Sequence, residues 1–341
     1  MDRYSRQTVL PGVGREGQER IGSGHAAVVG LGALGSSAAD LLVRAGVGRL
    51  TLIDRDVLEL HNLQRQALYT EEDVAERLPK AEAARRHLEA VDPRIGLTVH
   101  VADLDARSAL GLLDGADVLV DGTDNYETRY LINDVAVKTG RPWAYGGVLG
   151  SEGTMAAIRP GRTPCLRCLF PDPPPAGSVA TCETAGVWSP TVRVVASLEA
   201  SAALQFLMGE PPPGGLVHLD PRSGRLVRLE EGEPDPQCPA CGRHRYDFLD
   251  AEVPGMAVRP CGGGSVHVSP PGGRMGAGEM DLEALARRLS AQVGTVRKNP
   301  YLLQFDAEGV RMTVFADGRA LIQGTEEPDR ARSLYARFVG N

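Results

Sequence analysis

The sequence predicts an α/β fold in which a doubly wound, mostly parallel sheet is followed by a small α+β domain. Two observations predict it. In the first half of the chain, short apolar runs alternate with segments whose apolar residues repeat at helical spacing, which is typical of a parallel sheet with helices on both faces. A glycine-rich turn, GLGALG at residues 30–35, separates the first apolar run from the first helical segment.

The elements follow in order. Strands are expected at residues 25–29, 49–53, 97–101, 117–120 and 143–148, and helices at 34–45, 80–91 and 126–139. After the fifth strand, GSEGTMAAI predicts the start of a hairpin. The proline-free apolar stretch 191–208 predicts a largely buried helix, which PPPGG ends. Two short strands are expected at 216–219 and 226–229.

The composition shifts after about residue 250, so we expect domains at residues 1–250 and 251–341. In the second, a glycine-rich connection surrounds one short strand, and residues 282–289 predict an amphipathic helix. YLLQF, GVRMTVF and RALIQG predict three strands. A last helix is expected from Pro328 towards Phe338, with Thr325 as its N-cap.

The bulk composition excludes several classes. The chain of 341 residues is 42% hydrophobic and carries a net charge of −7, which argues against a nucleic-acid-binding surface over the whole molecule. No apolar run approaches a membrane span, and MDRYSRQTVL lacks a signal core, so we expect a cytoplasmic protein without membrane association. Cytosolic thiols stay reduced, and paired cysteines there indicate metal or redox chemistry.

The glycine turn, with Asp54 at the end of the second strand, forms a Rossmann-like dinucleotide fingerprint. Gly30, Gly32 and Gly35 would let the backbone approach phosphate at a helix N-terminus, and Asp54 would bind ribose hydroxyls. The fingerprint leaves NAD, FAD and ATP open. The competing interpretation is a tight turn without a ligand.

Cationic and amide side chains close behind the second strand favour a triphosphate. Asn62 and Arg65 lie in DRDVLELHNLQRQ, and Lys80 follows; arginine plus lysine suits charge neutralisation at phosphates. Asp124, in DGTDN after the fourth strand, is a candidate Mg²⁺ ligand. Taken singly, Asn62 can cap a helix, Arg65 can pair with an acid and Lys80 can be solvated.

Four of the six cysteines form two CxxC pairs, Cys165 with Cys168 and Cys238 with Cys241. Together they could complete a tetrahedral Zn²⁺ site of four thiolates. The alternative is two redox pairs without metal, which we disfavour because neither pair is expected at the start of a helix.

Several motifs together resemble the ThiF/MoeB family, bacterial relatives of the ubiquitin-activating enzymes. They are RYSRQ (3–7), GLGALG (30–35), NLQRQ (62–66), PKAEAA (79–84), TDNYETR (123–129) and TCETAGV (181–187), in order over residues 2–245. The resemblance implies ATP-dependent adenylation of the C-terminal Gly-Gly carboxylate of a small ubiquitin-like sulfur carrier protein. It implies ribose contact by Asp54, phosphate contacts by Asn62, Arg65 and Lys80, and Mg²⁺ on Asp124. It also implies zinc on the paired cysteines, and a homodimer in which Arg6 reaches the other subunit's ATP site.

Cys182, in TCETAGV, matches the loop that carries the family's cysteine. We expect it on an accessible loop, where it either forms a covalent intermediate in sulfur transfer or is a non-essential thiol, the sulfur coming from a donor such as a cysteine desulfurase. A buried structural thiol is the third interpretation. Cys261 is expected to be structural or incidental.

The pathway stays open among thiamin thiazole, molybdopterin and tRNA thiolation, with thiazole slightly preferred. Residues 251–341 do not resemble a rhodanese domain. Two other functions compete on the same fold. One is an NAD-dependent oxidoreductase, which the clustered Arg65 and Lys80 disfavour. The other is a non-catalytic scaffold that binds a partner, which the presence of Lys80 and Asp124 disfavours.

Overall fold

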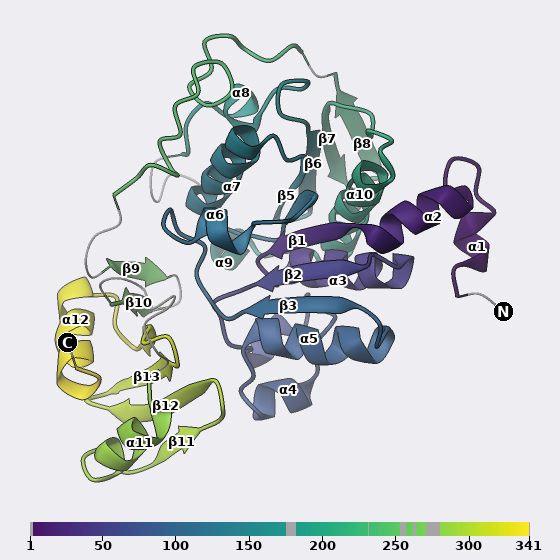
Figure 1. Cartoon of the computed structure of the whole chain (residues 1–341). Helices are drawn as coiled ribbons and strands as arrows, with labels where there is room; N and C mark the ends of the chain where they lie inside the picture. Colours follow the sequence, from purple (N-terminus) through teal and green to yellow (C-terminus); the bar gives the residue numbers. More distant parts are fainter. Residues whose placement is uncertain are drawn as a thin grey trace. The chain divides into compact units, whose positions relative to one another are not determined.

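A computed structural model describes residues 3–174, 182–230, 232–252, 257–261, 264–270 and 280–340. The chain divides into two compact units, Met1–Ala251 and Glu252–Asn341, which Figure 1 draws in purple to green and in green to yellow. Each unit has its own sheet and its own apolar core.

Unit 1 is built on an eight-stranded sheet in the order β3-β2-β1-β4-β5-β6-β7-β8. Its strands are β1 (His25–Val29), β2 (Arg49–Ile53), β3 (Gly96–His100), β4 (Val118–Asp121), β5 (Trp143–Leu149), β6 (Glu152–Ile158), β7 (Leu216–Asp220) and β8 (Arg225–Leu229). The first five pair in parallel, and β5 to β8 are antiparallel. The predicted Rossmann-like fold with a distal antiparallel segment is confirmed.

Helices cover both faces of this sheet. The helices are α3 (Ala33–Ala45), α5 (Lys80–Val91) and α10 (Ser189–Met208) on one face, and α6 (Ala109–Leu112) and α7 (Tyr126–Thr139) on the other. Successive strand side chains point to opposite faces: Val28 packs in the first core and Val29 in the second. Because both faces are buried, the central strands are continuously apolar, as the sequence predicts.

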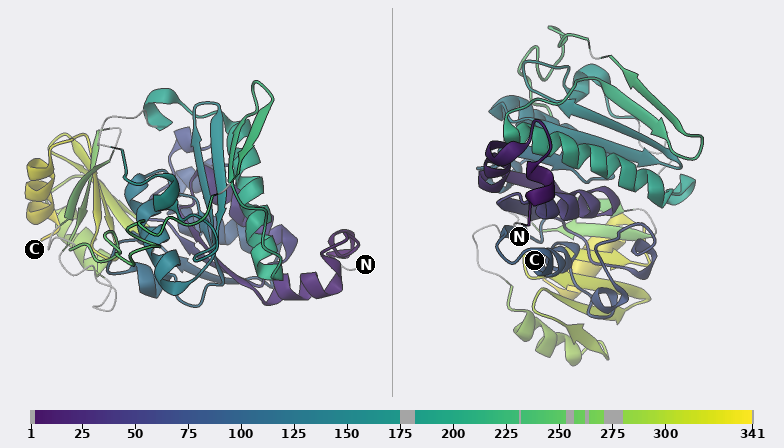
Figure 2. Two further views of the ribbon diagram at one scale, coloured as in Figure 1. Left: turned by 90° about the horizontal axis from the view of Figure 1, so that it is seen from above. Right: turned by 90° about the vertical axis from the view of Figure 1, so that its right-hand side faces the viewer.

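Helix α10 lies along the sheet (Figure 2, right) and contacts β4, β5, β6 and α3. Among the described helices it is the one long and apolar enough to cross a membrane, but half of its apolar window is buried inside the protein. It therefore belongs to the core of unit 1. The prediction of a largely buried helix was too strong, because residues such as Val194 remain 38% exposed.

Several short elements of unit 1 were not predicted. They are α1 (Ser5–Thr8), α2 (Gly14–Ser23), the 3-10 helix η1 (Leu60–Asn62), α4 (Glu71–Ala75), α8 (Leu166–Leu169) and α9 (Cys182–Ala185). Most span five residues or fewer, too short for a repeating apolar pattern to reveal them.

Unit 2 has an antiparallel six-stranded sheet in the order β11-β12-β13-β14-β10-β9. Its elements are β9 (Ala257–Cys261), β10 (Ser265–Ser269), α11 (Leu282–Ser290), β11 (Val296–Lys298), β12 (Leu302–Ala307), β13 (Val310–Phe315), β14 (Ala320–Gln323) and α12 (Pro328–Phe338). Both helices pack on one core with the sheet. The predicted strands and helices are present, and β9 and β11 were missed. The Thr325 N-cap was wrong: Glu327 is the N-cap, and the Thr325 hydroxyl accepts its N–H at 3.2 Å.

Candidate functional site

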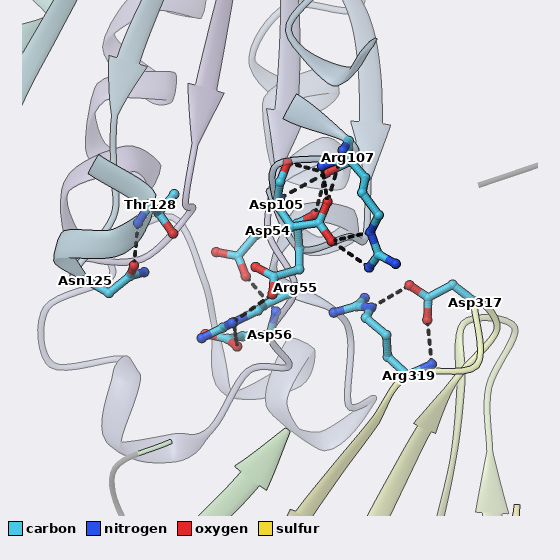
Figure 3. A network of polar contacts seen from close by, with 11 residues as sticks. Asp54, Arg55, Asp56, Asp105, Arg107, Asn125, Thr128, Asp317 and Arg319 are labelled. Carbon is cyan, nitrogen blue, oxygen red and sulfur yellow. Dashed lines mark hydrogen bonds and ion pairs between the residues drawn. The ribbon is translucent and has the colours of Figure 1, made fainter. Parts of the chain in front are cut away.

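The candidate site lies at the edge of the unit 1 sheet where β1, β2 and β4 end. Strands β1 and β4 are neighbours, although β2 and β3 lie between them in the chain. The loops that leave such a switch point run in opposite directions and open a crevice that ligands occupy. The predicted glycine turn follows β1, Asp54 follows β2 and Asp124 follows β4, so the fold brings these segments to one edge. Figure 3 shows Asp54 and Asp56 after β2, and Asn125 at the start of α7.

The glycine turn is held by backbone packing. A Cβ on Gly30, whose φ is +80°, would lie 2.8 Å from the Gly122 carbonyl oxygen, and one on Gly35 would lie 1.8 Å from the Gly30 carbonyl oxygen. Gly32 is different, since the nearest atom to its Cβ position is Gln66 Nε2 at 3.8 Å. Gly30 and Gly35 are therefore required for the turn, whereas Gly32, the N-cap of α3, leaves room for a phosphate at a helix N-terminus.

Asp54 is buried, and its carboxylate organises the turn around it. One oxygen accepts the Leu31 N–H at 2.6 Å and the other accepts the Asp56 N–H at 2.7 Å. Burial raises the pKa of Asp54 to about 6, against the lowering effect of Lys80. A carboxylate has about four acceptor positions, so two remain with which Asp54 can accept ribose hydroxyls.

Lys80 opens helix α5 and is buried, which excludes a solvated lysine. Its Nζ donates to Asp56 Oδ2 at 2.8 Å, and its backbone N–H donates to the Asp56 carbonyl oxygen at 2.9 Å. Burial by itself lowers the pKa of Lys80, but the carboxylates of Asp56, Asp54 and Asp124 together raise it above its usual range. The site therefore contains a fixed positive charge among three carboxylates.

Asn62, Arg65 and Gln66 follow on η1 and the turn after it. Asn62 caps η1, because its Oδ1 accepts the Glu59 N–H at 3.0 Å. Arg65 is half-buried and donates to the His61 carbonyl oxygen at 3.0 Å; in the described part of the chain no carboxylate pairs with it. Gln66 is buried beside Gly32, and its Oε1 finds no partner among the described residues. An unpaired buried oxygen is costly, which fits a ligand or water at this position.

The loop that carries Asp124 is held by a buried ion pair that the sequence analysis missed. Asp121 accepts from the Thr123 N–H and hydroxyl at 2.9 and 2.7 Å and from Arg129 Nε at 3.1 Å. Arg129 Nη2 donates to the carbonyl oxygens of Thr123 (2.7 Å) and Gly146 (3.0 Å). Burial raises the pKa of Asp121 although Arg129 opposes it. Asp124 itself is exposed, so its carboxylate can be reached from solvent.

The motif TDNYETR contains this arginine, but the sequence alone does not show that its side chain turns back to Asp121, eight residues earlier.

Arg6 lies apart from these residues. It is exposed on α1, and in the described chain it makes no hydrogen bond or ion pair with the other candidate residues. The N-terminal arm that carries Arg6, residues 3–8, is anchored to the rest of unit 1. Tyr4 Oη donates to Asp92 Oδ2 at 3.0 Å, and Arg3 donates to the Val91 carbonyl oxygen at 2.8 Å. A single chain therefore does not bring Arg6 to the site.

The four paired cysteines converge, with their Sγ atoms within 4.8 Å of one another. The separations are 3.9 Å for Cys165–Cys168, 3.5 Å for Cys165–Cys238 and 3.3 Å for Cys168–Cys241. Disulfide sulfurs are about 2.05 Å apart, whereas four thiolates about 2.3 Å from one zinc ion stand about 3.8 Å apart. The cluster could therefore bind zinc.

One premise about the cysteines was wrong. Cys165 is the N-cap of the four-residue helix α8, whereas neither pair was expected at the start of a helix. The convergence of all four sulfurs, rather than helix position, is what favours a metal. Asn133 of α7 supports the cluster, because its Nδ2 donates to Cys165 Sγ at 3.8 Å and its Oδ1 accepts the Leu166 N–H at 2.8 Å.

Cys182 is the first residue of α9, but its side chain lies outside the described residues, as does Thr181. The chain after it is fixed to the β5–β6 hairpin: Gly150 forms a bridge with Val187, and the Trp188 N–H donates to the Gly150 carbonyl oxygen at 2.7 Å.

Comparisons with known proteins assign the chain to a family. The ThiF family model matches residues 4–240. The chain is 41% identical over 340 residues to the sulfur carrier protein ThiS adenylyltransferase of Bacillus subtilis, covering 99% of both. It is 42% identical over 249 residues to the sulfur carrier protein adenylyltransferase of Thermus thermophilus, covering 71% of this chain and 91% of the relative. The crystal structure of E. coli MccB with ATP shares the fold, with a TM-score of 0.60 and 22% identity over 71% of this chain and 75% of that one. The chain belongs to the ThiF family.

Proposed function

We propose that the protein uses ATP to adenylate the C-terminal Gly-Gly carboxylate of a small ubiquitin-like sulfur carrier protein. One observation carries the proposal: a buried, charged Lys80 and an exposed Asp124 lie at the sheet edge where the open Gly32 turn can receive phosphates. The names of the Bacillus subtilis and Thermus thermophilus relatives support the same activity.

The residues of the site fit ATP with Mg²⁺. Asp54 would accept the ribose hydroxyls, and Asn62, Arg65 and Lys80 would contact the phosphates. Asp124 would hold Mg²⁺ through a carboxylate oxygen. Gln66 joins this set, since its unpaired oxygen beside Gly32 would be satisfied by a water or a nucleotide hydroxyl.

The chemistry needs positioning and charge more than an enzyme nucleophile. An oxygen of the carrier's terminal carboxylate attacks the α-phosphorus, and the bond from that phosphorus to the bridging oxygen breaks, so pyrophosphate leaves with the electron pair. Carboxylate and triphosphate repel each other, and cations held at the phosphates reduce this repulsion in the transition state. An oxidoreductase would need no such cluster of phosphate-directed cations.

We propose zinc as the metal of the four-cysteine cluster, in a structural role. All four ligands come from protein thiolates, so no coordination position stays open for chemistry. The ion would tie the loop after β6 to the segment after β8, which are far apart in sequence.

A homodimer is proposed because Arg6 is exposed on an anchored arm. From there it would complete the phosphate site of a second copy. The resemblance to the ThiF/MoeB family supports this arrangement. The proposed use of ATP favours a cytoplasmic location.

Cys182 is proposed to attack the carbonyl carbon of the carrier's acyl adenylate, forming a thioester as AMP leaves, or to accept the outer sulfur of a cysteine desulfurase persulfide, whose own thiolate is the leaving group. A Cys182→Ala protein that makes adenylate but no longer supports sulfur transfer fits this role. Full sulfur transfer by that variant would show that Cys182 is a non-essential thiol.

The pathway is proposed to be thiamin thiazole formation, because the match to the ThiS adenylyltransferase extends over both units; molybdopterin and tRNA thiolation carriers are the alternatives. Unit 2 would dock the carrier or a later enzyme. We propose that adenylation itself does not need unit 2, because the Thermus thermophilus relative, which is named for the same activity, is matched over 91% of its length by 249 residues.

The test is carrier-dependent exchange of labelled pyrophosphate into ATP, with each small Gly-Gly-ending protein of the organism tried in turn. We expect exchange with one carrier, and a loss of at least about 100-fold in Asp124→Ala. Absence of exchange with every carrier would contradict adenylation, and binding assays with ATP and NAD would then separate the scaffold from the oxidoreductase.

A further inference from the structure

Asp56 contacts Lys80 through both its side chain and its backbone, a pairing that the sequence motifs did not predict. Besides the side-chain contact at 2.8 Å, the Asp56 carbonyl oxygen accepts the Lys80 backbone N–H at 2.9 Å. The neighbouring residues continue the contact: Val57 forms an antiparallel bridge with Pro79. The segment after β2 and the start of α5 are therefore joined by side-chain and backbone contacts.

The three carboxylates around Lys80 are not equivalent. Both oxygens of Asp54 are engaged by backbone N–H groups, and Asp124 is exposed and acts on Lys80 through its charge. Of the three, Asp56 is the one that accepts a hydrogen bond from Nζ within the described chain. An ammonium has three donors, so this contact fixes one N–H and leaves two to point elsewhere.

We propose that Asp56 is a positioning residue that aims the remaining N–H groups of Lys80 at the nucleotide phosphates and keeps the lysine charged in its buried site. This inference rests on the proposed function. A lysine is a point charge on a flexible four-carbon stem, so orienting it before ATP arrives removes an ordering cost from binding and from the transition state.

The charges around Lys80 favour the same role for Asp56 as the contact geometry does. Burial lowers the pKa of Lys80, and Asp56 is the largest influence that opposes burial; Asp54 and Asp124 are the other carboxylates that act on it. Without the Asp56 charge, burial would count for more, and Lys80 would lose its proton at a lower pH. Phosphate binding would then weaken as the pH rises.

The test uses Asp56→Asn, which keeps size but removes charge, with Asp56→Glu as the variant that restores it. Asp40→Asn is the matched control, because Asp40 pairs with Arg44 at 2.9 Å on α3. In the nucleotide-free proteins, the rate at which an amine-directed acylating reagent labels Lys80 is followed against pH by peptide mapping. At any one pH below the midpoint of the titration, we expect Asp56→Asn to be labelled at least about tenfold faster than wild type, which corresponds to a midpoint lower by about one pH unit, and Asp56→Glu to be labelled at the wild-type rate.

ATP binding gives the second measurement. Dissociation constants at several pH values should rise at least about tenfold in Asp56→Asn, with the loss growing at alkaline pH, and stay unchanged in Asp40→Asn. Unchanged labelling, or unchanged affinity for ATP in Asp56→Asn, would overturn the role of Asp56. If the wild-type protein binds no ATP at any pH, the proposed function fails together with this role, whereas wild-type binding with an unaffected Asp56→Asn overturns the role of Asp56 alone.

Discussion

The glycine turn and the cysteine cluster are both closely arranged, but different forces arrange them. Backbone atoms of Gly30, Gly35 and Gly122 approach so closely that a single Cβ would overlap a carbonyl oxygen. The cysteines instead bring four sulfurs to within 4.8 Å from two loops that are distant in sequence. Packing is sufficient to hold the turn, whereas neighbouring thiolates repel one another unless a cation lies between them.

The glycine turn and the cysteine cluster are therefore vulnerable to different changes. The turn depends on the absence of side chains, so adding one methyl group should damage it. The cluster depends on a ligand, so removing the ligand should damage it without any change in sequence. The largest effect is expected for the ligand, because structural zinc contributes on the order of 10 kcal/mol in small peptides.

Metal removal is therefore the first prediction. We expect chelation, or Cys168→Ser, to release zinc and to lower the unfolding midpoint of unit 1 markedly, because Cys165 and Cys238 are buried in the core beneath α7. Metal analysis and chemical denaturation measure the two effects. Cys261→Ser is the control, since no metal role is assigned to Cys261. Protein that is purified without metal and keeps its midpoint in chelator would contradict a structural ion.

The second prediction concerns the turn. Gly35→Ala places a Cβ 1.8 Å from the Gly30 carbonyl oxygen, and backbone cannot yield as a side chain can. We expect a loss of at least about 3 kcal/mol in the free energy of unfolding, with loss of ATP binding. Urea denaturation and nucleotide titration provide the measurements.

Gly111→Ala is the matched control for the turn. Gly111 lies in α6 and a Cβ there would meet nothing within 4 Å. Alanine should stabilise the protein by about 0.5–1 kcal/mol, since it restricts the unfolded chain. Equal effects at the two glycines would mean that the close approach in the turn is relieved by movement.

The sequence predicted those parts of the site that depend on short, contiguous sequence patterns. The run ending at Gly30 and the spacing to Asp54 follow from one strand-turn-helix unit, and helices α5 and α7 were predicted with the bounds that the structure has. The CxxC spacing predicted two halves of a metal site, but only the fold unites them. The Asp121–Arg129 pair and the Asp56–Lys80 pair were not predicted, because such pairing depends on which side chains are buried together, and the periodicity of a single sequence does not show this.

Glu199 shares one feature with each of the other two sites. It packs closely against a glycine, as in the turn, and its side chain lacks a hydrogen-bond partner among the described residues, as the cysteine thiolates would lack a counter-charge without a cation. It is fully buried on α10, and neither carboxyl oxygen has a partner among the described residues. A Cβ on Gly146 would lie 2.2 Å from Glu199 Oε1, so the glycine makes room for the acid. Burial raises the pKa of Glu199 well above its usual range; Asp121 adds to this and Arg129 opposes it.

The last prediction is that Glu199→Gln becomes increasingly stabilising as the pH rises. Between the unfolded and the folded pKa of Glu199, the folded protein holds a proton that the unfolded chain has released, so wild-type stability falls by up to about 1.4 kcal/mol per pH unit. Glutamine has no proton to lose, and the other raised carboxyls contribute similarly to both proteins. The two should differ least near about pH 4.5 and most near about pH 8, by chemical denaturation at each pH. Glu210→Gln, at an exposed glutamate, is the matched control. A constant difference between Glu199→Gln and wild type would mean that Glu199 is ionised in the fold, and that a buried cation or water network satisfies it as zinc is proposed to satisfy the cysteines.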